Sequence, residues 1–118
     1  MKKAIAILCV MLAGCSGMPD KKVDGVDNLK TTEYVLSQFD ATMTCARLMN
    51  VPAAMAFIVL PFACANINLD RWTCDIYYAE ATAGLSLEHE RKHCLGYWHD
   101  DGLQEYFDAW NKSRATAK

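Results

Sequence analysis

The 118-residue sequence lacks several features that would each place it in a large class of proteins. It has no cluster of Lys and Arg, and its net charge is −2, which argues against nucleic-acid binding. It has no Cys-x-x-Cys pair, which argues against a zinc site built from four cysteines. No uninterrupted apolar run reaches the roughly 20 residues that a membrane-spanning helix needs. The length fits one small domain and not two.

The N-terminus has the pattern of a secretory signal, with a basic start at residues 1–3 and an apolar run over residues 4–13. The sequence from Leu12 to Cys15, Leu-Ala-Gly-Cys, resembles the lipobox of bacterial lipoproteins. The resemblance implies that residues 1–14 are a signal peptide and that Cys15 carries a lipid. The mature protein is then anchored in the cell envelope and faces the periplasm. Ser16 after the lipidated cysteine is compatible with the outer membrane.

Residues 15–30 are polar, with two Gly and a Pro, and are expected to form the lipidated cysteine and a flexible tether. The folded domain is expected over residues 31–118. Its order is predicted as helix, strand, strand, helix, helix, which is an α+β fold. The predicted elements are a helix within 31–49, a buried strand over 55–60, a half-buried strand over 71–79, a helix from Ser86 to Leu95 and a final helix from Asp101.

All three histidines of the chain lie within eleven residues, in the pattern His-Glu-x-x-His-x-x-Gly-x-x-His. His89 and His93 are four residues apart, so on a helix they project from one face about 6 Å from each other. Gly96 can adopt a positive φ angle without steric cost, which lets the chain turn and bring His99 toward the pair. We therefore predict that these three histidines bind one zinc ion per chain.

Glu90 follows the first histidine and is expected to point toward the same space without binding the metal. A carboxylate in that position is suited to act as a general base on an attacking water. Three protein ligands leave one coordination position open, which distinguishes a catalytic zinc site from a closed structural one. The motif therefore predicts a hydrolytic site with Glu90 as its catalytic residue.

These five residues resemble the motif of the metzincin clan of zinc metallopeptidases, and Asp100 is similar to the aspartate that ends the motif in the adamalysin and snapalysin groups. The resemblance covers roughly residues 70–100. It implies a minimal zincin-like domain in which the active-site helix lies under a short sheet. An antiparallel edge strand of that sheet then runs along the cleft and pairs with the peptide substrate. The strand expected over residues 71–79 is in the right order to be that edge strand.

Two features depart from the metzincin pattern. The clan has a methionine in a turn below the zinc, after the third histidine, whereas the last methionine here is Met55. Only nineteen residues follow His99, so the usual C-terminal subdomain is missing. The floor of the site must come from other residues. The candidates are Trp98, Tyr106, Phe107 and Trp110.

Four cysteines remain besides Cys9 in the signal and Cys15: they are Cys45, Cys64, Cys74 and Cys94. An even number in an exported chain of this size indicates two disulfides, with three possible pairings. We expect Cys74–Cys94, which fastens the 71–79 strand to the metal helix, and hence Cys45–Cys64. Cys94 as a fourth zinc ligand is disfavoured, because neighbouring residues on a helix diverge by about 100°.

Asp100 has two possible roles, as a hydrogen-bond partner of a ligand histidine or as a cap of the last helix. The overall expectation is a lipid-anchored zinc metallopeptidase that cleaves peptide bonds in the cell envelope. Its partners are a peptide or protein substrate and the membrane, and not nucleic acid. The alternative is an envelope lipoprotein that binds zinc and hydrolyses nothing.

Overall fold

The computed structural model describes residues 18–52 and 63–116. In chain order, its elements are β1 (Lys21–Lys22), β2 (Lys30–Leu36), α2 (Gln38–Leu48), β3 (Ala63–Asn68), β4 (Thr73–Ala79), the 3-10 helix η1 (Glu80–Thr82), α4 (Ala83–Cys94), β5 (Tyr97–Trp98) and α5 (Gly102–Thr116). This is a small α+β fold, as predicted. None of the helices in these two ranges is long and apolar enough to cross a bilayer.

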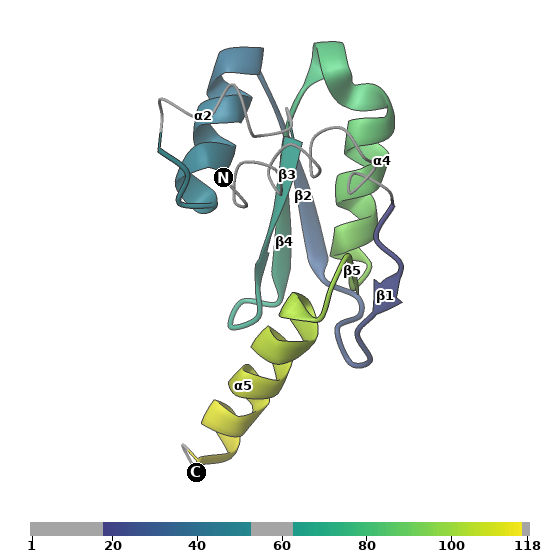
Figure 1. Ribbon diagram of the computed structural model, residues 1–118, viewed down its shortest axis with the longest axis vertical. Coiled ribbons are helices and arrows are strands. Elements are labelled where there is room, and N and C mark those ends of the chain that lie inside the picture. Colours follow the sequence, from purple (N-terminus) through teal and green to yellow (C-terminus); the bar gives the residue numbers. More distant parts are fainter. Residues whose placement is uncertain (1–17, 53–62, 117–118) are drawn as a thin grey trace, which may run out of the picture.

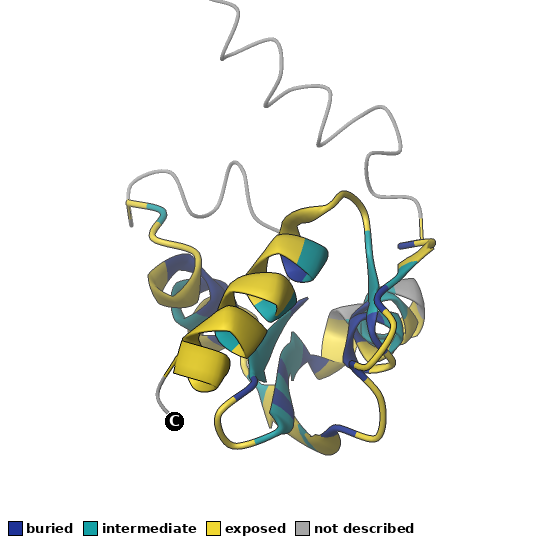
Figure 2. Cartoon of the chain, turned by 90° about the horizontal axis from the view of Figure 1, so that it is seen from below, coloured by how far each residue is buried: buried dark blue, intermediate teal, exposed yellow. Residues whose placement is uncertain are grey.

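A three-stranded sheet in the order β2-β4-β3 forms the middle layer, with β2 parallel and β3 antiparallel to β4. Helix α2 covers one face and α4 covers the other (Figure 1). Successive side chains of β4 point to opposite faces of the sheet. Cys74 and Ile76 are buried on the α4 side, whereas Tyr77 packs toward α2. The outer surface of α5 is largely exposed (Figure 2).

The strand predicted over residues 71–79 is present as β4, but its expected position at a sheet edge is wrong. The parallel strand β2 pairs with it on one side and the antiparallel strand β3 on the other. Neither neighbouring strand was predicted from the sequence. The residues of β3 follow a long apolar run, and the residues of β2 were assigned to a helix. The backbone of β4 is therefore fully paired and cannot bind a substrate strand.

The helix predicted within residues 31–49 begins later than expected, at Gln38. Residues 30–36, Lys-Thr-Thr-Glu-Tyr-Val-Leu, form β2 because β-branched and aromatic side chains favour a strand. Ser37 then ends the strand and caps α2, since its hydroxyl accepts a hydrogen bond from the Asp40 N–H at 3.1 Å. The buried strand predicted over residues 55–60 lies outside the described residues.

Helix α4 begins at Ala83, three residues before the cap predicted at Ser86. Gly84 has non-helical φ and ψ angles of −24° and −111°, so the first turn is kinked. The end of the helix agrees with the prediction, because α4 stops at Cys94 and Gly96 has a φ of +94°. The final helix, predicted from Asp101, begins at Gly102.

The prediction of a flexible tether over residues 15–30 is wrong for the part of this segment that the structure describes. Residues 18–29, named the N-terminal strap from here on, pack against the rest of the domain. Val23, Val26 and Leu29 are buried in the main hydrophobic core, and β1 pairs antiparallel with β5. The favourable free energy of burying these three apolar side chains, which are spaced by three residues, outweighs the polar composition of the segment.

Both expected disulfides are present. Cys45–Cys64 joins α2 to β3 on one face of the sheet, and Cys74–Cys94 joins β4 to α4 on the other. Each typically stabilises a small exported domain by about 2–4 kcal/mol. The second bridge also fixes α4 to the central strand.

Candidate metal centre

The structure brings the three predicted histidines together at the C-terminal end of α4. One nitrogen from each of His89, His93 and His99 lies within 4.8 Å of the other two. The Nε2 atoms of His89 and His99 are 3.0 Å apart. Nitrogen ligands at about 2.0–2.1 Å from a tetrahedral zinc are about 3.3 Å from one another. The three imidazoles therefore fit one metal ion after small side-chain adjustments.

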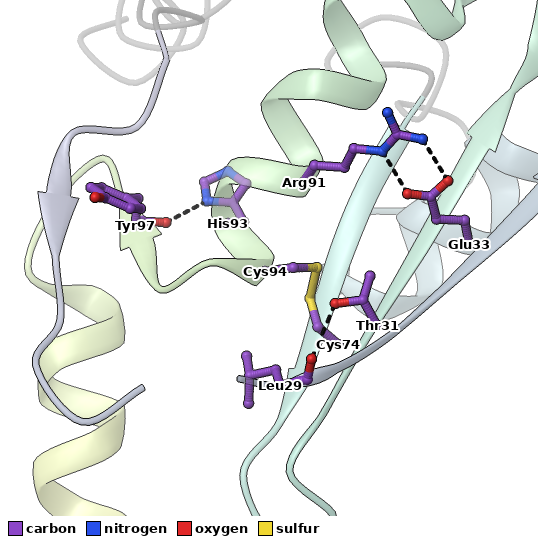
Figure 3. The surroundings of a disulfide bond; sticks show 8 residues. All are labelled: Leu29, Thr31, Glu33, Cys74, Arg91, His93, Cys94 and Tyr97. Carbon is purple, nitrogen blue, oxygen red and sulfur yellow. Dashed lines mark hydrogen bonds and ion pairs between the residues drawn. A yellow bond between two sulfur atoms is a disulfide. The ribbon is translucent and has the colours of Figure 1, made fainter. Parts of the chain in front are cut away.

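His93 is held in the tautomer that a metal site needs. It is buried, and its Nδ1 lies 2.9 Å from the backbone carbonyl oxygen of Tyr97 (Figure 3). A carbonyl oxygen can only accept, so Nδ1 carries the proton and donates it. The lone pair of Nε2 is then available for a metal, an arrangement typical of ligand histidines. The ring of Trp98 packs against His93 at a centroid distance of 4.2 Å.

The turn that returns His99 to the helix is held by the N-terminal strap. The Val23 N–H donates to the Gly96 carbonyl oxygen at 2.9 Å, and β1 pairs with β5 just before His99. Gly96 has no room for a side chain, because an added Cβ would meet the Val26 carbonyl oxygen and lie 3.0 Å from the Lys22 ammonium. Positive φ and close backbone contact together explain the glycine of the motif.

Replacing Gly96 by Ala should destabilise the domain by more than about 1 kcal/mol and weaken zinc binding, because the strap and the His99 turn must move apart. Urea unfolding and zinc titration of the purified domain measure the two effects. Gly84→Ala is the control, since an added Cβ there meets nothing within 4 Å. Zinc affinity in Gly96→Ala equal to that of the wild type would show that the strap does not set the position of His99.

Burial favours the neutral form of His89 and His93, which is the form that binds metal. Desolvation lowers the pKa of His93 to about 4, against a smaller opposing effect of its bond to Tyr97. Desolvation also lowers the pKa of His89, and the nearby His99 adds to this decrease. His89 and His93 can thus accept a cation at neutral pH without first losing protons.

Glu90 is 6% exposed, and burial raises the pKa of its carboxyl group to about 8. No hydrogen bond or ion pair joins this carboxyl group to another residue in the described part of the chain. A largely buried acid without a partner destabilises a fold, so its presence on the helix that carries two of the three clustered histidines points to a functional role.

The other predicted residues have definite positions. Cys94 points toward the sheet and is bonded to Cys74, so its sulfur is not available to a metal (Figure 3). The Asp100 carboxylate accepts a hydrogen bond from the Gly102 N–H at 2.8 Å, which favours its role at the start of α5. Of the candidates for the floor, Trp98 contacts His93. Phe107 and Trp110 pack on the main core, and Tyr106 is 44% exposed.

Sequence reasoning missed two contributions to the site. One is the Tyr97 carbonyl, which no residue pattern identifies because every residue has one. The other is the N-terminal strap. Its signal in the sequence was the three apolar residues Val23, Val26 and Leu29, which are buried in the core. They lie around Gly25, a glycine with a φ of +95°. On helix α4, Arg91 forms a two-point ion pair with Glu33 of β2 at 2.6 and 2.8 Å.

No protein-family model, curated protein or solved structure matches this chain.

Proposed function

We propose that this protein is a zinc-dependent peptidase that is anchored by a lipid on Cys15 and faces the periplasm, in the outer membrane. The observation that carries the proposal is the convergence of three histidine nitrogens within 4.8 Å of one another, next in the sequence to the largely buried Glu90. Among the described residues the donor set is three imidazoles with no available thiolate, because the four described cysteines form disulfides. Such a set is typical of a catalytic zinc site with an open position.

His89, His93 and His99 would hold the zinc, and the Tyr97 carbonyl would orient His93. Zinc bound there would supply Lewis acidity, which polarises a carbonyl group and acidifies water. Glu90 would take a proton from the attacking water and later give it to the leaving amine. Burial raises the pKa of this carboxyl group to about 8 in the metal-free structure, and a zinc ion nearby would lower it toward the range in which a carboxylate accepts a proton at neutral pH.

A peptide substrate would bind in extended form along β3. Of the described strands, β2 and β3 are the two edges of the sheet, and α4 packs against β3 and β4. A strand added to β3 would continue the sheet on the side nearest the metal helix. This replaces the expected pairing with β4, whose two sides are occupied.

The second candidate is a non-catalytic zinc-binding lipoprotein of the envelope. The central position of β4 favours it, because the substrate strand expected from the metzincin pattern has no place there. A structural zinc gains nothing from Glu90, however, and a buried unpaired acid costs stability.

The direct experiment is hydrolysis of a broad peptide library by the domain with zinc bound, after zinc removal, and after zinc is restored. We expect cleavage to stop when the zinc is removed and to return when it is restored. Tight zinc binding without any cleavage would favour the non-catalytic candidate instead.

A further inference from the structure

The packing of the N-terminal strap limits how far the metal centre can lie from Cys15. Pro19 is fully buried, and Lys21 is paired with Trp98, the residue before His99. Only residues 16–18 lie between Cys15 and the buried proline. The chain that would carry the lipid therefore enters the domain directly at the turn that holds the third ligand.

Chain geometry gives an upper limit for the distance. Six peptide steps from Cys15 to Lys21 span at most about 22 Å. The strand pair Lys21–Trp98 and one further step to His99 add about 9 Å. His99 thus lies within about 31 Å of Cys15, whereas a free tether through residue 30 would alone allow about 54 Å.

His99 is also the exposed ligand of the three, while His93 is buried. The accessible side of the centre is therefore at the corner of the domain where the strap enters. A lipid on Cys15 would keep this corner close to the bilayer surface.

We infer that the metal centre acts on peptide segments held next to the membrane surface, within about 31 Å of the bilayer that carries the lipid of Cys15. This inference rests on the proposed lipid attachment and peptidase function. Peptide bonds that stay beyond this distance from the bilayer are out of reach of the anchored enzyme. The substrate class is thus peptide segments that come within this distance of the membrane surface.

The test measures how close the corner of the domain that carries His99 lies to the lipid headgroups. It needs neither zinc nor hydrolysis, so its failure is distinguishable from that of the peptidase proposal. The full chain, with Asp101→Cys carrying a nitroxide, is purified from membranes, and its N-terminal mass and both disulfides are verified. Asp101 is exposed and lies 3.4 Å from Lys21. The protein is placed in vesicles of phosphatidylethanolamine and phosphatidylglycerol, and the relaxation of lipid phosphorus is measured.

The matched control has twenty Gly and Ser residues inserted between Gly17 and Met18. A flexible chain of that length adds tens of ångströms, and nitroxide relaxation falls with the sixth power of distance. We expect strong relaxation with the natural strap and at least about a fivefold decrease with the insertion. Equal relaxation in the two proteins, or an N-terminal mass without lipid on Cys15, would overturn the inference.

Discussion

Replacing Glu90 by Gln should lower peptide hydrolysis by about 10²–10⁴-fold while zinc remains bound, because the amide keeps the shape of the side chain but cannot accept the proton. The measurement compares wild type and Glu90→Gln, both loaded with one zinc per chain, on the same peptide library. Glu88→Gln is the matched control, since Glu88 is exposed on the same helix. Equal hydrolysis by wild type and Glu90→Gln would show that Glu90 is not the base.

The same variant should be more stable than the wild type when zinc is absent. Burial raises the pKa of Glu90 from 4.5 to about 8, so its protonated form is favoured in the folded state. The stability that this carboxyl group supports is present below pH 4.5 and is lost as the pH rises through 8. Glu90→Gln does not titrate, so its advantage should grow to a few kcal/mol between pH 5 and pH 9. Urea unfolding of the zinc-free proteins at both pH values measures this difference.

Replacing any one of His89, His93 or His99 by Ala should weaken zinc binding on the order of a thousandfold. The binding free energy of about 10–16 kcal/mol typical of structural zinc sites is shared by very few ligands, so each one contributes several kcal/mol. Competition with a chromophoric chelator gives the affinities, and Lys92→Ala is the control between two ligands. Zinc content in His93→Ala equal to that of the wild type would rule out the three-histidine site.

The local parts of the site could be predicted because the residues that determine them are close together in the sequence. His89 and His93 share a helix face by their spacing, and Gly96, as a glycine, adopts the φ of +94° that follows without steric cost. The disulfide Cys74–Cys94 was predictable once a strand was placed beside the metal helix. Each of these inferences needs fewer than about twenty-five residues of sequence.

The parts that failed depend on pairing between distant segments. β2 and β4 are more than thirty residues apart, so neither the parallel pair nor the central position of β4 can be derived from the pattern of β4 alone. The strap was mistaken for a tether because charged residues separate its valines. Its packing follows from contacts with Gly96 and with Phe107 of α5, which are more than seventy residues away.

The central claim is that three histidine nitrogens and no protein sulfur hold the zinc. Zinc K-edge X-ray absorption of the zinc-loaded domain tests it most directly, because nitrogen and oxygen ligands at about 2.0–2.1 Å are separated from sulfur at about 2.3 Å. We predict three imidazole nitrogens, one further light-atom ligand and no sulfur in the first coordination shell. A sulfur ligand, or a spectrum with fewer than three imidazoles, would contradict the proposed site.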